Sequence, residues 1–184
     1  MTHPVEELYA EHRLIERMLS EVEERLAGKG PLPCEFVETA LDFFRTFADG
    51  LHHHKEEKAL FPALEASGVP TEGGPVAVML YEHTLGRQCL ATIRESLPAA
   101  RAGSAAADQD IRRAAGDYID LLRRHIWKED NILFMIAKSR LTSEQQMLDL
   151  QALFDEENRT GLHRRYEDLL NEITKAKSPS PTCA

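Results

Sequence analysis

Six side chains that can bind metal ions recur at helical spacing along this sequence. Four are histidines and two are glutamates: His12, His52, Glu56, His83, His125 and Glu129. Two of the histidines are followed by a glutamate four residues later, and residues four apart lie on the same face of an α-helix. Imidazole nitrogens and carboxylate oxygens together suit iron or manganese, and no cysteine accompanies them. The pattern predicts a metal site assembled from several helices.

These residues interrupt stripes that are otherwise apolar. His12, for example, lies in a stripe with Leu8, Ile15 and Leu19, and such spacing marks the buried side of a helix. A single histidine there would be explained by a hydrogen bond in the core, and a single His-x-x-x-Glu pair by an ion pair on the surface. Four helices that each bury a histidine, two of them with a glutamate as well, need a common partner, because an unpaired buried carboxylate is costly. Two metal ions meet that need.

Glycine and proline divide the chain into five expected helices, over about residues 4–27, 33–66, 74–98, 108–138 and 142–174. Pro62 is expected to kink or weaken the end of the second helix, and Thr142 with Gln145 is spaced as a capping box for the fifth. The sequence thus predicts an all-α fold. It consists of an up-down-up-down four-helix bundle over residues 1–140, an additional C-terminal helix over 141–176 packed on the bundle or on a partner, and a flexible tail over 177–184.

Charge and composition disfavour several classes of function. The 184 residues carry a formal net charge of -9, which opposes binding to the phosphates of nucleic acids. No apolar run approaches the ~20 residues of a membrane span. The N-terminus lacks the basic and apolar regions of a signal peptide, so a cytoplasmic location is expected. Cys34, Cys89 and Cys183 are scattered and indicate neither a disulfide framework nor a thiolate metal site.

Two longer motifs surround the histidine–glutamate pairs. Residues 52–64 read HHHKEEKALFPAL, and residues 125–134 read HIWKEDNILF. The pairs Glu11-His12 and Glu82-His83 accompany the two lone histidines. In these motifs, and over about residues 5–140, the sequence resembles the hemerythrin-like, or HHE cation-binding, family.

The resemblance implies a binuclear non-haem iron centre inside a four-helix bundle. By that resemblance two iron ions share an oxo or hydroxo bridge, Glu56 and Glu129 bridge the ions, and the four histidines are terminal ligands. Iron is expected in preference to manganese or zinc. The expected partner is a small diatomic ligand, with no role for nucleic acid or a membrane.

The sequence departs from the oxygen-carrying hemerythrins at two positions. Arg87 stands where those proteins have a second histidine, one turn after the third-helix ligand, and Glu129 follows His125 by four residues where they have an aspartate at five. The pattern is nearer to bacterial relatives linked to nitric oxide, oxygen sensing or repair of iron-sulfur centres. One missing nitrogen ligand would leave an extra open position for small ligands on one iron.

Several neighbouring residues have two interpretations. If the helical register is one residue off, His53 with Glu57 replaces His52 with Glu56; otherwise His53 and His54 are expected at the surface or behind the ligands. Glu11, Glu82 and Asp130 are expected to lie behind the ligands or in solvent, because adjacent helix positions point about 100° apart.

The remaining alternatives concern one arginine, four aromatic residues and a histidine. Arg87 is either part of an ordinary ion pair or a cap that stabilises an anionic ligand. Core packing is expected in preference to a place in the ligand pocket for Tyr9, Tyr81, Tyr118 and Trp127. His163, on the fifth helix, is expected outside the site and is compatible with a contact in a homodimer.

Three functions fit these features. The first is a protein that reversibly binds oxygen or nitric oxide for sensing, storage or scavenging. The second is a di-iron enzyme that acts on peroxide or nitric oxide, or a donor of iron for the repair of iron-sulfur centres. The third is a metal-storage bundle without redox use. The sequence predicts no catalytic side chain. Whether the protein is an enzyme depends on which of these functions it has.

Overall fold

The computed structural model describes residues 2–28 and 30–176, and within them the chain is helical without a β-strand. The predicted all-α class is therefore confirmed. The helices of the bundle are α1 (Val5–Leu26), α2 (Cys34–Phe43), η1 (Phe44–His53), η2 (Glu56–Leu60), α3 (Phe61–Ala66), α4 (Pro75–Arg101), α5 (Ala105–Lys128), η3 (Glu129–Leu133) and α6 (Phe134–Arg140). Two more helices follow, α7 (Glu144–Asn158) and α8 (Leu162–Lys175).

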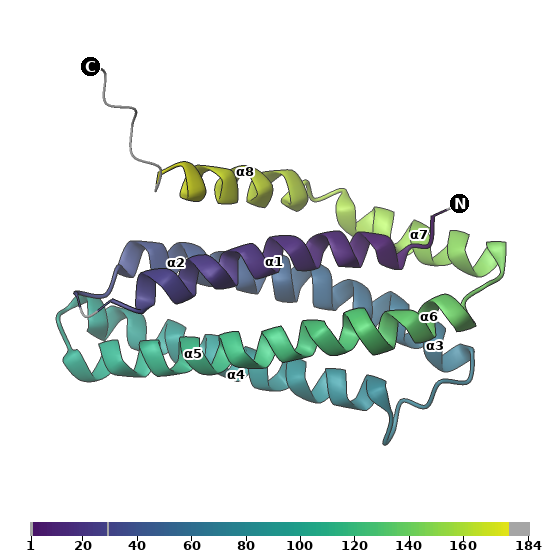
Figure 1. Ribbon diagram of the computed structural model, residues 1–184, viewed down its shortest axis with the longest axis horizontal. Coiled ribbons are helices and arrows are strands. Elements are labelled where there is room, and N and C mark those ends of the chain that lie inside the picture. The colour runs from purple at the N-terminus through teal and green to yellow at the C-terminus, as the bar shows by residue number, and fades with distance from the viewer. Residues whose placement is uncertain (1, 29, 177–184) are drawn as a thin grey trace, which may run out of the picture.

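Four long helical stretches lie lengthwise beside one another (Figure 1). They are α1, the stretch from α2 through α3, α4, and the stretch from α5 through α6, and the chain reverses direction between successive stretches. α1 and α4 each contact both α2 and α5, so the stretches close around a common interior.

Two separate apolar clusters fill this interior. One includes Ile15, Phe47 and Leu122, and the other includes Leu8, Leu60 and Phe134. Along each long stretch the predicted site residues fall between members of the two clusters. His12, for example, lies between Leu8 of one cluster and Ile15 of the other. The histidines and glutamates therefore occupy a polar layer between two apolar regions.

Three segments of the ligand-bearing helices are π-helical, namely η1, η2 and η3. A π-helix closes its hydrogen bonds over five residues instead of four, and such segments often accompany functional sites. The sequence predicted regular helices here, because spacing alone does not reveal a change in the number of residues per turn. Pro62 lies in the first turn of α3, immediately after η2, where its missing N–H group is tolerated.

The expected fifth helix is two helices. The chain breaks at Gly161, whose φ of 70° lies in the left-handed region. The capping box is also one residue later than predicted, since Ser143 and Gln146 form it. We call residues 144–175, which comprise α7 and α8, the C-terminal arm. The arm contacts α1, η1 and η2 and buries Tyr166 and Leu170 against the bundle.

The remaining expectations concern the cysteines, the C-terminal tail and membrane spans. Cys34 and Cys89 are free thiols, whereas Cys183 and the expected flexible tail lie outside the described residues. Among the described helices, none is long and apolar enough to cross a membrane.

We expect Gly161→Ala to lower the free energy of unfolding by about 1 kcal/mol, because alanine is strained at positive φ. Gly116→Ala is the matched control: Gly116 lies in the exposed part of α5, and a Cβ atom there meets nothing within 4 Å. The control should raise the free energy by up to about 1 kcal/mol. Urea unfolding measures both, and equal stabilisation by the two substitutions would contradict the role of Gly161.

Candidate metal centre

All six predicted ligands lie in the polar layer between the apolar clusters. Each is 1% exposed or less: His12, His52, Glu56, His83, His125 and Glu129. They come from α1, η1, η2, α4, α5 and η3, so every long stretch of the bundle contributes at least one. The structure therefore brings together side chains that are more than 100 residues apart in the sequence.

The donor atoms form two groups that share a carboxylate. His12 and His52 gather with Glu56 and Glu129, and a second group joins His53, His83 and His125 to the same Glu56; within each group the atoms lie within 4.8 Å of one another. The second glutamate also lies between the groups, because Glu129 has one oxygen 3.2 Å from His12 Nε2 and the other 3.2 Å from His125 Nε2. This arrangement can hold two cations with both carboxylates between them.

His53 was not among the six predicted ligands, but it lies in the second group. It was expected at the surface or behind the ligands, yet it is buried, and its ring stacks on that of His83 with the centroids 3.8 Å apart. The cause is η1, which ends at His53. More residues per turn bring successive side chains closer together in angle, so His52 and His53 both reach the interior. His54, outside this segment, is half-exposed and near Glu157.

Arg87 stands where a second histidine was expected after His83. The cluster nevertheless contains a fifth imidazole, because His53 lies beside His83. Arg87 itself lies at the surface and donates to Asp49 and Glu57, 2.8 Å from each. It is thus part of an ordinary ion pair. Glu57 faces the outer nitrogen of His83 and joins neither group, so the alternative pairing of His53 with Glu57 is not formed.

Each of the five histidines donates from Nδ1 to a carboxylate outside the cluster. The N···O distances are 2.6 Å for His12 to Asp130, 2.8 Å for His52 to Glu11, 3.3 Å for His53 to Asp49, 2.7 Å for His83 to Glu57 and 3.0 Å for His125 to Glu82. A carboxylate only accepts, so Nδ1 carries a proton and Nε2 is the ring nitrogen that can bind a cation. Glu11, Glu82 and Asp130 thus lie behind the predicted ligands.

Most of the atoms that face the middle of the cluster form no hydrogen bond. Among the described residues, Nε2 of His12, His52 and His53 and both carboxylate oxygens of Glu56 and Glu129 are buried without a hydrogen bond. Nε2 of His83 and of His125 lie only 3.2 Å apart. Buried polar atoms without partners are costly, and cations between the two groups would satisfy them. The donor set therefore fits bound metal.

Comparison with known proteins agrees with this geometry. The model of the hemerythrin HHE cation binding domain matches residues 3–137, which is most of the chain. The chain belongs to the hemerythrin HHE cation-binding family. The predicted resemblance is thereby confirmed, and so is the coarser prediction of a metal-binding protein.

The curated relatives add no function. Uncharacterized proteins of Mycobacterium tuberculosis and Mycobacterium bovis are each 27% identical over 168 residues, which cover 88% of this chain and 62% of the relative. The chain thus spans less than two thirds of the length of these relatives. No solved structure matches the chain.

Charge inside this hemerythrin-like site is balanced between imidazoles and carboxylates. Burial lowers the pKa of His12, but the hydrogen bond to Asp130 and the nearby carboxylate of Glu129 outweigh it and raise the pKa to about 9. Burial likewise lowers the pKa of His125, whereas the charge of Glu129 and the hydrogen bond to Glu82 raise it to about 10. Without a cation, these imidazoles hold protons that offset the carboxylates, and a bound metal would displace them.

Two of the four aromatic residues do not lie where they were expected, whereas His163 lies outside the site as predicted. Tyr81 is 64% exposed and Trp127 60% exposed, so the expected core packing is wrong for both. Tyr118 is buried, and Tyr9 donates to the backbone oxygen of Asp130. His163 lies outside both groups of donors, as predicted, but it contacts Glu11, the carboxylate behind His52.

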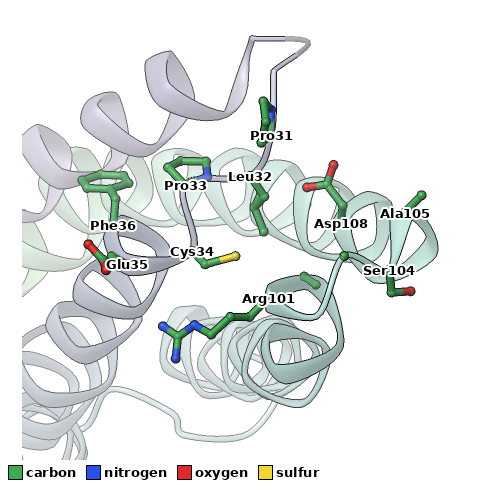
Figure 2. Close-up of a pocket in the computed structure, with 12 residues that line it drawn as sticks. Pro31, Leu32, Pro33, Cys34, Glu35, Phe36, Arg101, Ser104, Ala105 and Asp108 are labelled. Carbon is green, nitrogen blue, oxygen red and sulfur yellow. The ribbon is translucent and has the colours of Figure 1, made fainter.

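A surface pocket lies where the chain passes from α1 to α2 and from α4 to α5 (Figure 2). Leu32, Cys34, Arg101 and Asp108 are among its lining residues. Its described lining includes none of the clustered histidines or carboxylates, so this pocket is separate from the candidate metal centre.

We expect Asp130→Asn to weaken the binding of ferrous iron by about tenfold, because the charged acceptor of His12 Nδ1–H is lost. Glu95→Gln, at a carboxylate of α4 that is 71% exposed, serves as the control and should leave the affinity unchanged. Competition with a coloured chelator measures both variants. Equal affinities in the two variants would show that Asp130 does not support His12.

Proposed function

We propose that this protein holds two iron ions between its two groups of histidines and uses them to bind a small diatomic ligand, dioxygen or nitric oxide. The observation that carries the proposal is the buried cluster of inward-facing imidazole and carboxylate atoms, most of which form no hydrogen bond. His12 and His52 would hold one ion and His53, His83 and His125 the other. Glu56 and Glu129 would bridge them.

The donor set favours iron. Five imidazoles and two carboxylates exceed what one tetrahedral zinc ion takes, and thiolates are absent from both described groups. Nitrogen and oxygen donors with room for further coordination are typical of non-haem iron, with manganese as the nearest competitor. The Nδ1 hydrogen bonds to five carboxylates would raise the basicity of every imidazole and so favour a cation of high charge.

The two groups are unequal, and this supports binding of an external ligand. One group has three histidines and the other has two, while both lie against the same two carboxylates. The ion beside His12 and His52 would therefore have one protein donor fewer and would bind the ligand. His12 is fully buried and stacks on Phe134, with the ring centroids 5.3 Å apart. Such close burial favours a ligand of only a few atoms.

The decisive experiment is to reduce the iron-loaded protein without oxygen and then to expose it to oxygen or nitric oxide. A new absorption band that disappears when the gas is removed supports reversible binding. Catalytic loss of added peroxide or nitric oxide would instead assign a di-iron enzyme. Identical redox behaviour of the iron-free and iron-loaded protein would leave only metal storage.

We expect His52→Ala, His53→Ala and His125→Ala each to lower the iron content well below two atoms per chain. His54→Ala is the matched control, because His54 follows His53 directly and its side chain is 42% exposed. It should retain two iron atoms. Elemental analysis measures the content, and full occupancy in the first three variants would refute the ligand assignment.

Removal of iron by a chelator should lower the melting temperature by about 5–10 °C. A ligand present at a hundred times its Kd stabilises a folded protein by about 2.7 kcal/mol, and 1 kcal/mol corresponds to roughly 2–4 °C at this chain length. Calorimetry before and after chelation measures the shift, and re-addition of ferrous iron is the control. An unchanged melting temperature would contradict an iron site inside the core.

A further inference from the structure

Glu11 connects the candidate metal centre to the C-terminal arm. Its carboxylate is fully buried and contacts groups on both sides. Oε2 accepts the hydrogen bond from Nδ1 of His52, at 2.8 Å, and Oε1 accepts one from Nε2 of His163, at 2.5 Å. His163 lies in α8, whereas His52 lies in η1. A chain of two hydrogen bonds therefore runs from the arm to a predicted ligand.

Lys55 binds the same carboxylate from the bundle side. Its side chain is fully buried, and its ammonium donates to Glu11 and Glu7 and, at 2.6 Å, to the side-chain oxygen of Asn158. Asn158 is the last residue of α7 and also donates to Glu7, at 2.8 Å. Both helices of the arm thus take part in one buried network.

This network does not present a third cation site, although Glu7, Glu11 and His163 have suitable spacing for one. The ammonium of Lys55 already supplies the positive charge between the two glutamates. The network satisfies the buried carboxylate of Glu11 at both oxygens, as buried charge requires. The network therefore holds the carboxylate of Glu11 in one orientation.

The arm lies outside the matched family domain, because the match to the hemerythrin HHE cation binding domain ends at residue 137 and the arm begins at residue 144. The family model therefore contains His12 and His52 but neither Asn158 nor His163. Glu11 therefore receives support from a segment that lies outside the matched domain.

We propose that the C-terminal arm is a positioning element of the metal centre, in which His163 holds Glu11 and Glu11 in turn orients the imidazole of His52. The inference rests on the proposed function, since His52 must bind iron for its orientation to matter. A carboxylate anchored at Oε1 keeps Oε2 directed at Nδ1 of His52, which fixes both the tautomer and the ring plane. His52 belongs to the group with two histidines, so the arm supports the ion that would bind the external ligand.

The test uses the full-length, iron-loaded protein and three variants. His163→Ala removes the donor to Glu11, and His163→Gln retains a side-chain N–H group at that position. Tyr166→Phe is the matched control on the same helix, because it removes the bond of the Tyr166 hydroxyl to Asp42, 2.8 Å long, without touching Glu11. The measured quantities are the rate of iron loss to a chelator and the visible absorption spectrum of the bound iron.

We expect His163→Ala to lose iron about tenfold faster than the unchanged protein, and to shift its absorption spectrum, in keeping with the effect of removing a partner behind a metal ligand. His163→Gln should restore most of the original rate, and Tyr166→Phe should match the unchanged protein in both measurements. Thermal melting of the iron-free variants checks that the arm remains folded.

Two results would overturn the inference while the proposed function stands. If His163→Ala loses iron no faster than Tyr166→Phe, His163 does not support the metal centre through Glu11. If His163→Gln behaves like His163→Ala, the ring contact of His163 with Phe47 is what matters, and not the hydrogen bond to Glu11. If the unchanged protein binds no iron, the proposed function itself fails, and this outcome is recognised before any variant is compared.

Discussion

The burial of two carboxylates between five imidazoles is the constraint on which the rest of this structure depends. Glu56 and Glu129 lie in a layer between two apolar clusters, and their oxygens have no hydrogen-bond partner among the described residues. Apolar packing alone would exclude charge from this layer, because an uncompensated buried carboxylate destabilises the fold. The bundle therefore needs positive charge at its centre, supplied by protons on imidazoles or by metal ions.

The carboxylates that accept from Nδ1 of the clustered histidines also connect the helices to one another. A carboxylate next to one predicted ligand in the sequence supports a histidine on a different helix. Glu11, beside His12, accepts from His52, and Glu82, beside His83, accepts from His125. Adjacent residues of a helix point about 100° apart, so one reaches the interior while its neighbour reaches the next helix. The metal centre and the packing of the helices are thus specified by the same short motifs.

The C-terminal arm extends this principle beyond the domain that the family shares. It adds a histidine and an asparagine around Glu11 and Lys55, and so encloses one side of the layer without entering it. A buried lysine with three oxygen partners also binds the arm firmly to the bundle, since leaving that ammonium unpaired would be costly. Attachment of the arm and support of the site therefore depend on one set of contacts.

The sequence by itself determined the helical class and the burial of six of the seven clustered side chains, because both follow from periodicity, and glycine and proline marked most of the helix boundaries. It failed at His53, because a π-helical segment changes the number of residues per turn, and residue types alone do not reveal that change. It also failed to predict the exposure of Tyr81 and Trp127, whose hydrophobic character says nothing about which face of a helix finds a neighbour. Only the tertiary structure decided that Arg87 pairs with Asp49 and Glu57 and that His163 contacts Glu11. These contacts join helices far apart in the chain, and the packing of whole helices, not local spacing, sets which side chains meet.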